Sequence, residues 1–198
     1  MFSNVRFASA ADFSGASFTQ YEDFGGARFD GDATFSRASF IALPRTRYEM
    51  DFPQHANFDN AAFAQDADFS QATFTAFVGF RRVTFTGAVS FNGASFEGAY
   101  FADATFGQRA DFRQTSFMYV KPSFEDLEER LQTARFSAQA DPQDYLFEAR
   151  PESTHGFSCG ETELLNRTFV LPLGAVLYDP DSWDEEKQEY TRVSEPAQ

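Results

Sequence analysis

Two residues with the chemistry of a nucleophilic pair lie close together in this chain, His155 and Cys159. A thiol becomes a strong nucleophile when a neighbouring imidazole removes its proton, so this spacing could build a reactive site. No group that would orient the pair is evident nearby, and a free cysteine is more often a small buried apolar side chain. With 1 Cys and 2 His in the chain, we expect neither a disulfide framework nor a metal site.

Carboxylates are the other chemical groups in excess, with 30 Asp and Glu against 16 Lys and Arg and a net charge of -14. Most of those in the stretch 1–120 alternate with apolar residues. They should therefore face water, where nothing raises their pKa for acid–base catalysis. The sequence also lacks a P-loop, a G-x-G-x-x-G motif, a G-x-S-x-G motif and an H-E-x-x-H motif. We expect a protein that is not an enzyme, holds no cofactor and does not bind nucleic acid directly.

Phenylalanine carries the strongest pattern, with 27 Phe against 7 Tyr and 1 Trp. From Phe2 to Phe117 the steps between Phe residues are mostly five or six, which is neither a helical nor a strand period. The residue two before each Phe is usually Ala or Val, and the residue between is mostly polar. Alternate residues of an extended chain point to the same side. Each Phe and its small neighbour should therefore face inward, and stacked coils should form one column of rings.

This pattern resembles the pentapeptide-repeat family, whose unit is a small residue, a polar residue, a central Leu or Phe, and two polar residues. The segments Ala11–Gly15, Ala16–Gln20 and Ala94–Gly98 match that unit. The resemblance covers roughly Phe2 to Phe117 and implies a right-handed β-helix with four sides per coil. We therefore expect an all-β, quadrilateral solenoid of about five coils over residues 1–120, with an extra residue after every second unit.

The Phe spacing is interrupted between Phe40 and Phe52, where the step is 12 and the expected double step is 11. We interpret this interruption as one skipped Phe plus one inserted residue. Arg45, Arg47 and Tyr48 should then lie on a loop that projects from the rod. Loops on rigid scaffolds often carry function, and a tolerated bulge is the plainer alternative.

After Phe117 the pattern changes and predicts a helical cap over residues 121–150. Ser123 opens a sequence that resembles a capping box, and four apolar residues then follow with helical spacing: Phe124, Leu127, Leu131 and Ala134. A second short helix is expected after Asp141–Pro142. These helices would cover the open end of the Phe column.

Residues 151–198 form an acidic extension. Two strands are expected on either side of Pro172–Gly174, followed by a polar, mobile tail from Asp184 onward. The segment 155–166 faintly resembles the entry motif of acetyltransferase-type toxins, but too few residues follow to complete that fold. The longest apolar run, Phe169–Tyr178, is too short to cross a bilayer, and no secretory signal is visible. We expect a cytoplasmic protein with no membrane contact.

Charge is unevenly distributed along the chain. Residues 1–120 contain 13 acidic and 9 basic side chains, net -4, whereas residues 121–198 contain 17 and 7, net -10. If the four sides are numbered from Phe2, five acidic residues should form a ridge along one face of the rod: Glu22, Asp23, Asp66, Asp68 and Asp111. Ordinary solvated charge that keeps the protein soluble is the alternative.

Our first hypothesis is a non-catalytic scaffold that binds a protein partner through Phe169–Tyr178 or through the acidic end. The second comes from the resemblance, because pentapeptide-repeat proteins include quinolone-resistance and self-immunity factors that mimic DNA and bind DNA gyrase or topoisomerase IV. The loop around Arg45–Tyr48 and the acidic ridge would then contact this type II topoisomerase. A third is that the β-helix is itself the substrate of a modifying enzyme. The N-terminal end of the rod lacks a comparable cover, so it could form a homodimer or fray.

Overall fold

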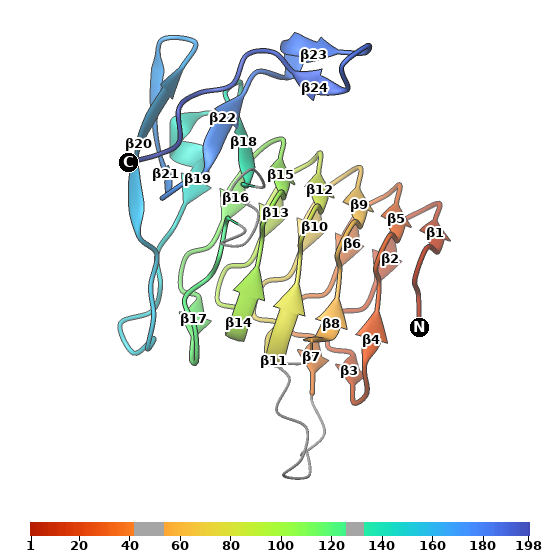
Figure 1. The fold of residues 1–198 in the computed structure, drawn as a ribbon. Helices are drawn as coiled ribbons and strands as arrows, with labels where there is room; N and C mark the ends of the chain where they lie inside the picture. The colour runs from red at the N-terminus through yellow and green to blue at the C-terminus, as the bar shows by residue number, and fades with distance from the viewer. Residues whose placement is uncertain (42–53, 126–132) are drawn as a thin grey trace.

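The computed structural model describes residues 1–41, 54–125 and 133–198, and it is almost entirely β-sheet (Figure 1). Three parallel sheets run along the molecule, each built from strands that recur once per coil. The first contains β1 (Arg6–Phe7), β5 (Arg28–Phe29), β9 (Ala62–Phe63), β12 (Thr84–Phe85), β15 (Thr105–Phe106), β18 (Arg135–Ser137) and β22 (Val176–Tyr178). The second contains β2 (Ala11–Asp12), β6 (Ala33–Thr34), β10 (Ala67–Asp68), β13 (Val89–Ser90), β16 (Ala110–Asp111) and β19 (Tyr145–Leu146).

The third sheet bends around a corner and so supplies two faces of the coil. One part contains β3 (Ser17–Phe18), β7 (Ser39–Phe40), β11 (Thr73–Gly79), β14 (Ser95–Tyr100) and β17 (Ser116–Phe117). The other part pairs β4 (Glu22–Asp23) with β8 (Gln54–Asn57), and β8 with the second half of β11. The expectation of an all-β stack of parallel coils is confirmed, and the right-handed sense of the winding stays a prediction.

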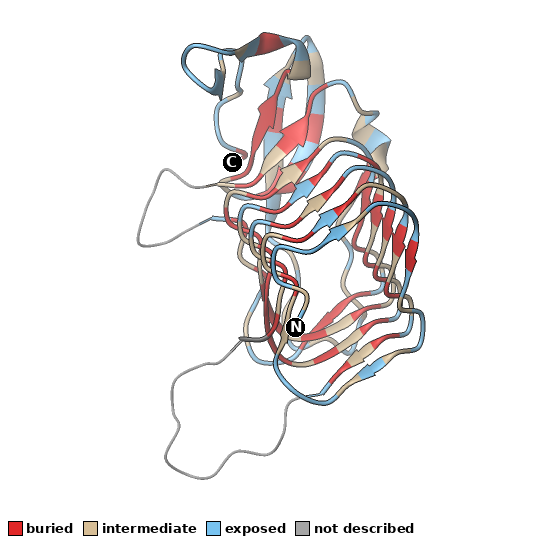
Figure 2. Ribbon diagram, turned by 90° about the vertical axis from the view of Figure 1, so that its right-hand side faces the viewer, coloured by how far each residue is buried: buried red, intermediate tan, exposed pale blue. Residues whose placement is uncertain are grey.

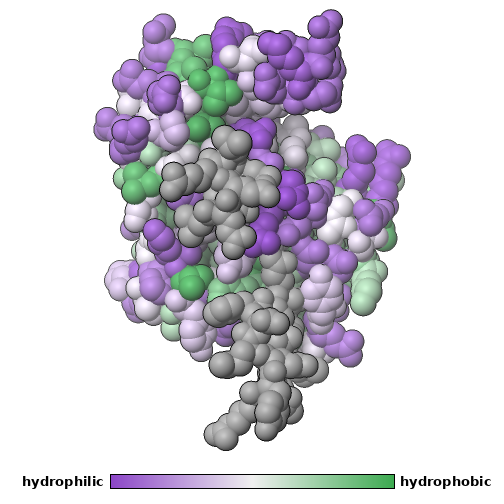
Figure 3. Space-filling view, viewed as in Figure 1, coloured by the Kyte–Doolittle hydropathy of each residue, from purple (hydrophilic) through white to green (hydrophobic). Residues whose placement is uncertain are grey.

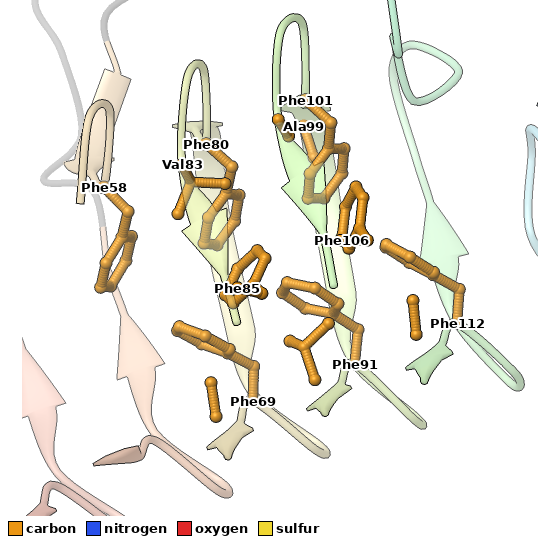
Figure 4. Packing of buried hydrophobic residues seen from close by; sticks show 14 of the residues in the cluster. Phe58, Phe69, Phe80, Val83, Phe85, Phe91, Ala99, Phe101, Phe106 and Phe112 are labelled. Carbon is orange, nitrogen blue, oxygen red and sulfur yellow. The ribbon is translucent and has the colours of Figure 1, made fainter. Parts of the chain in front are cut away.

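The Phe residues form columns along the axis of the stack (Figure 4). Rings in successive coils lie nearly parallel, with centroids from 4.6 to 5.5 Å apart. Rings from opposite sides of the coil meet edge to face, as Phe69 and Phe80 do at 5.4 Å. Both geometries suit the quadrupole of an aromatic ring.

The inner side of the stacked strands is buried and largely apolar, as the alternation predicted (Figure 2). Phe35, Phe58 and Phe91 are completely buried, and so are the small residues Ala72 and Val83 that come two positions before a Phe. Since a ring occupies the interior at every level, only a small side chain fits beside it. The hydrophobic column is therefore a consequence of local alternation together with stacking.

The interruption after Phe40 is an insertion, after which the regular stacking of Phe rings from coil to coil resumes. In the coils on either side of it, residues that meet in successive coils are 22 positions apart in the chain, as Arg6 and Arg28 are before it and Asn60 and Arg82 are after it. Across it the separation is 34 positions, as between Asp23 and Asn57, so one coil is longer by the length of segment 42–53. Phe58 accordingly stacks on Phe24, at 4.9 Å. The interpretation as one skipped Phe plus one inserted residue is therefore wrong, and Phe52 lies outside the described residues.

A deletion tests this count directly. Joining Ile41 to Gln54 removes residues 42–53 and places Phe58 six positions after Phe40, the same step that separates Phe18 from Phe24. We expect the free energy of unfolding to change by less than about 1 kcal/mol, because loop length costs little. Urea unfolding followed by circular dichroism measures it. Removing only residues 42–52 should be far more damaging, because the strands after the deletion lose their register.

The predicted helical cap over 121–150 is wrong for the described residues, because the coil continues there. Phe124 stacks on Phe101 at 5.1 Å, and Phe136 on Phe106 at 4.6 Å. Ala134 is buried beside them, just before β18, which pairs with β15. Leu127 and Leu131 lie outside the described residues. Pairing with the preceding coil therefore decides the structure here, against the local helical spacing.

The second expected helix, after Asp141–Pro142, is also wrong. Only a single 3-10 turn forms, η1 (Pro142–Asp144), in which the Asp141 carboxylate accepts a hydrogen bond from the Gln143 N–H. The chain then enters β19, which pairs with β16. Phe147 stacks on Phe112 at 5.4 Å, so this segment continues the Phe column as well.

The C-terminal end of the column is covered by β-structure. The antiparallel hairpin β20 (Cys159–Leu164) and β21 (Arg167–Pro172) buries Phe169 and Leu171 against the last rings. The two strands expected around Pro172–Gly174 are confirmed as β21 and β22. The tail expected to be mobile instead forms a second hairpin, β23 (Trp183–Asp184) and β24 (Glu189–Tyr190), preceded by the turn η2 (Pro180–Ser182). It then returns to bury Ala197.

Within the described part of the chain, no helix has the length and apolar character to span a membrane.

Candidate functional site

The acidic residues predicted to form one ridge lie on different faces of the rod. Asp68 and Asp111 end strands β10 and β16 of the second sheet, and Asp66 lies at its corner. Glu22 and Asp23 form β4, which pairs with β8 in the third sheet. The prediction is wrong because a skipped Phe would have shifted all later residues by two sides. Arg45, Arg47 and Tyr48 lie outside the described residues.

The carboxylates of the second sheet shape its turns. Asp12 and Asp68 each accept a hydrogen bond from the backbone N–H two residues later, at 2.8 Å, and Asp66 accepts one from the Ala88 N–H at 2.9 Å. Asp32, Asp66 and Asp68 also line a shallow groove of about 380 Å³ on this face. These bonds explain why Asp suits the positions, because its side chain satisfies a turn N–H.

The acidic character of this face ends at Asp111. Arg113 and Arg109 contact its carboxylate at 2.6 and 3.2 Å, and the residue is only 5% exposed. Burial by itself raises the pKa of Asp111, but hydrogen bonds and charge from Arg113, with a further hydrogen bond from Arg109, outweigh it and hold the pKa below its usual value. The two guanidinium groups therefore neutralise the C-terminal end of the groove.

A larger cleft lies where the rod meets the β23–β24 hairpin, which we call the C-terminal hairpin. It has a volume of about 640 Å³, within the range of ligand sites in proteins. One wall is the rod, with Thr84, Thr105 and Gln108, and a second is the turn η1, with Asp141 and Asp144. The third wall is aromatic, from Tyr178 and Tyr190. Three separate parts of the chain thus build one concave surface.

The aromatic wall of this cleft is held by its own contacts. The rings of Tyr178 and Tyr190 lie 4.4 Å apart, and Trp183 packs edge-on against Tyr190 at 5.0 Å. At the base of the hairpin, Asp179 is buried and paired with Arg192 at 2.8 Å. Burial raises the pKa of Tyr178 far above its usual value, so this phenol stays neutral. The hairpin is accordingly anchored to the rod by packed rings and by an ion pair whose carboxylate is buried.

Comparison with known proteins identifies the repeat. Residues 69–116 match the family model for pentapeptide repeats, in 9 copies. This part of the chain consists of pentapeptide repeats. The matched segment corresponds to β11 through β17, where the coils follow one another without an insertion. Comparisons with curated proteins and with solved structures give no significant match.

His155 and Cys159 of this pentapeptide-repeat protein do not have the geometry of a nucleophilic pair. The His155 Nε2 lies 2.9 Å from the backbone oxygen of Tyr119, which is a suitable acceptor for its N–H. The Cys159 side chain sits at the start of β20, and burial raises the pKa of its thiol. A raised pKa lowers the thiolate fraction, which is opposite to activation. His155 is instead a structural contact between Tyr119, just after β17, and the segment that leads into β20.

The residues of the cleft were missed by sequence reasoning. Asp141 and Asp144 were assigned to a helix, and Tyr190 to a polar tail. One usable signal existed: Trp183 and Tyr190 are large apolar residues inside an otherwise acidic segment. Such residues usually have a packing partner, and here it is Tyr178 of the pentapeptide-repeat rod.

Proposed function

We propose that this pentapeptide-repeat protein is a non-catalytic scaffold that binds a protein partner, and that the cleft beside the C-terminal hairpin receives a basic segment of that partner. The observation that carries the proposal is the lining of the cleft, which combines the Asp141 and Asp144 carboxylates with the rings of Tyr178 and Tyr190. A guanidinium or ammonium group gains from both kinds of contact, by charge-assisted hydrogen bonds and by cation–π attraction.

The surroundings of the cleft support a basic partner. Hydrophilic side chains gather over the β23–β24 hairpin (Figure 3), where Asp181, Glu185, Glu186 and Glu189 are exposed. Residues 121–198 contribute -10 of the net charge of -14. A concentrated charge of one sign raises the encounter rate with an oppositely charged partner. Arg109, the basic side chain in the cleft, is already paired with Asp111 at 3.2 Å.

The other partner surface expected from sequence, Phe169–Tyr178, is mostly buried, and its exposed large apolar residues are Val170 and Leu173, at 52% and 45%. Phe169, Leu171 and Leu177 are at most 1% exposed. These three side chains pack against the end of the Phe column, so a partner could not reach them without unfolding this part of the protein. Of the two surfaces expected from sequence, the acidic end is therefore the more accessible one.

The binding test uses the intrinsic fluorescence of Trp183, the single Trp of the chain, which lies 5.0 Å from Tyr190. We expect a peptide of alternating Arg and Ala to change this fluorescence saturably at low salt, and an alternating Glu and Ala peptide to have no effect. The double variant Asp141→Asn/Asp144→Asn should weaken binding at least ~10-fold, because both carboxylate charges are lost. Asn keeps the oxygen that caps η1, so the fold should be retained.

A matched control carries the same charge change on another face. Asp66→Asn/Asp68→Asn also removes two charges and keeps the oxygens that accept the turn hydrogen bonds. If both double variants weaken the peptide equally, binding reflects net charge alone and the cleft is not the site. If the cleft is the site, capture from cell extract with the same three proteins should retain a partner on the wild type and on the control only.

A second candidate function is mimicry of DNA toward a type II topoisomerase. The observation that favours it is the acidic half of the second sheet, where Asp12, Asp32, Asp66 and Asp68 lie on one face. Against it, Glu22 and Asp23 lie elsewhere, and Arg109 and Arg113 neutralise Asp111. The same variants separate the two functions. Inhibition of gyrase supercoiling that is lost in Asp66→Asn/Asp68→Asn, and kept in Asp141→Asn/Asp144→Asn, would favour mimicry.

A further inference from the structure

The cleft beside the C-terminal hairpin carries charges of both signs, on different walls. Arg109 lies on the rod wall next to Gln108, and Asp141 and Asp144 lie on the η1 wall. In the described part of the chain, these three are the charged residues that line the cleft. A guanidinium only donates hydrogen bonds, and a carboxylate only accepts them. The rod wall therefore suits an anionic group, and the η1 wall suits a cationic group.

Arg109 has donor groups that the fold does not use. Its Nη2 contacts the Asp111 carboxylate at 3.2 Å, but Arg113 makes the closer pair, through Nε at 2.9 Å and Nη2 at 2.6 Å. The backbone N–H of Arg113 adds a third bond to Asp111, at 3.0 Å. Asp111 is thus held with or without Arg109.

The positive charge of Arg109 is also incompletely matched. Two guanidinium groups share the single carboxylate of Asp111, and a further charge interaction, from Glu148, acts on Arg113. The Arg109 side chain is 47% exposed, and the residue lines both the cleft and the neighbouring groove of the second sheet. It is therefore placed to contact an anionic group of a ligand in the cleft.

The carboxylates on the η1 wall likewise have no cation beside them. Over residues 1–41, 54–125 and 133–198, no ion pair includes Asp141 or Asp144. Asp141 accepts one hydrogen bond, from the Gln143 N–H, through a single oxygen. The cleft thus offers unmatched charge of each sign, and a ligand that satisfies both walls must itself carry both signs.

We infer that the basic segment of the partner carries an acidic residue directly beside its basic residue, as in an Arg-Glu pair. This inference rests on the proposed function, because it specifies the ligand of the same cleft. Neighbouring side chains of an extended segment point to opposite sides. The basic side chain can then face Asp141 and Asp144 while the carboxylate faces Arg109, with charge-assisted hydrogen bonds at both walls. Two contacts of opposite sign also fix the register of the segment.

General attraction between charges predicts the opposite preference. Residues 121–198 carry a net charge of -10, so the surroundings favour the more positive of two peptides. At an ionic strength of about 0.15 M, exposed charges more than about 8 Å apart are largely screened, and direct contacts are screened less. At that salt concentration, the sign of the preference therefore separates contact with Arg109 from general attraction.

Two peptides of equal length test the inference, Arg-Ala-Arg-Glu-Ala and Arg-Ala-Arg-Gln-Ala with blocked ends. Their dissociation constants are measured with wild-type protein from the fluorescence of Trp183, at an ionic strength of about 0.15 M. We expect the Glu peptide to bind at least ~3-fold more tightly, although it is the less positive one. If the Gln peptide binds equally or more tightly, the inference is wrong and the cleft still binds basic segments. If neither peptide binds, the proposed function fails as well.

The variant Arg109→Gln identifies the side chain responsible. It leaves Arg113 on Asp111, so the fold should be retained, and circular dichroism checks this. The preference for the Glu peptide should disappear or reverse. Asp141→Asn/Asp144→Asn should instead weaken both peptides, because both present a basic residue to the η1 wall.

The matched control is Arg37→Gln, which removes the same charge from an exposed side chain outside the cleft. The Arg37 Nε donates to the Gln71 amide oxygen at 3.2 Å. This control should keep the wild-type preference. A preference that survives in Arg109→Gln, or that both variants lose equally, would contradict a contact with Arg109. If Arg109→Gln does not fold, the comparison of the two peptides on wild-type protein still decides the inference.

Discussion

Replacing Phe91 with Ala should cost about 3–5 kcal/mol of unfolding free energy, the range for buried aromatic truncations. Phe91 is completely buried and stacks between Phe69 and Phe112, at 5.1 and 4.9 Å (Figure 4). It also meets Phe80 and Phe101 edge to face, at 5.3 and 5.6 Å. The rings above and below belong to strands paired by hydrogen bonds, so the cavity cannot collapse. Urea unfolding followed by far-ultraviolet circular dichroism measures the loss.

The matched control is Phe2→Ala in the first coil. Phe2 contacts Phe24 at 4.9 Å on one side, and its other side is partly exposed. Because less apolar surface is removed from water there, we expect roughly half the loss or less. Equal losses at the two positions would mean that the column does not act as a continuous core.

Replacing Gly87 with Val should be the second large effect, at least ~2 kcal/mol, from overpacking between coils. A Cβ at Gly87 would lie 2.5 Å from the carbonyl carbon of Gln65 and 2.7 Å from its oxygen. Those atoms are backbone in the neighbouring coil and cannot rotate away. The coils would separate at a point where the Ala67 N–H donates to the Ala88 carbonyl at 2.9 Å.

Thr86→Val is the control for that substitution, since it introduces the same side chain at the adjacent, exposed position. We expect its unfolding free energy to stay within about 0.5 kcal/mol of the wild type. Urea unfolding of the two variants side by side measures the difference. Comparable losses would show that a valine anywhere in this turn is destabilising, and that contact between coils is not the cause.

The sequence was sufficient where the pattern is local and repeated. Ala and Phe two positions apart share a side of an extended chain, and the outcome is that Ala72 and Phe74 are both buried. Polar residues between them, such as Thr73, face outward for the same reason. Because the same pattern recurs in every coil, the side of each residue can be assigned reliably within an uninterrupted stretch.

The assignment of Phe residues to the sides of the coil was wrong at the interruption, because Phe52 has the spacing of the repeat. Phe52 lies six positions before Phe58, so it reads as the next lattice position. Only pairing between coils, such as that of Asp23 with Asn57, shows that one coil is longer by a whole inserted segment. The acidic ridge was misplaced for this reason, since a wrong side number moves Asp68 and Asp111 to the wrong face.

The prediction of a helical cap is wrong because it rests on the local spacing of apolar residues and does not include pairing with the preceding coil. Phe124 and Ala134 have spacings that a helix could use, but Phe124 has Phe101 to stack on and Arg135 has Thr105 to pair with. Continuing the stack buries the last rings and satisfies backbone hydrogen bonds at once. A helix laid across the end would leave the edges of β15 and β16 unpaired.

The amino-acid sequence by itself determined the kind of fold, because inward Phe, a small residue beside it and a polar residue between are properties of neighbouring positions. It also determined the excess of acid in the last third of the chain. Only the tertiary structure decided which carboxylates share a face, what covers each end of the rod, and that Thr84, Asp141 and Tyr190 line one cleft. These features depend on the number of residues in each coil and on contacts between distant segments, which no local pattern specifies.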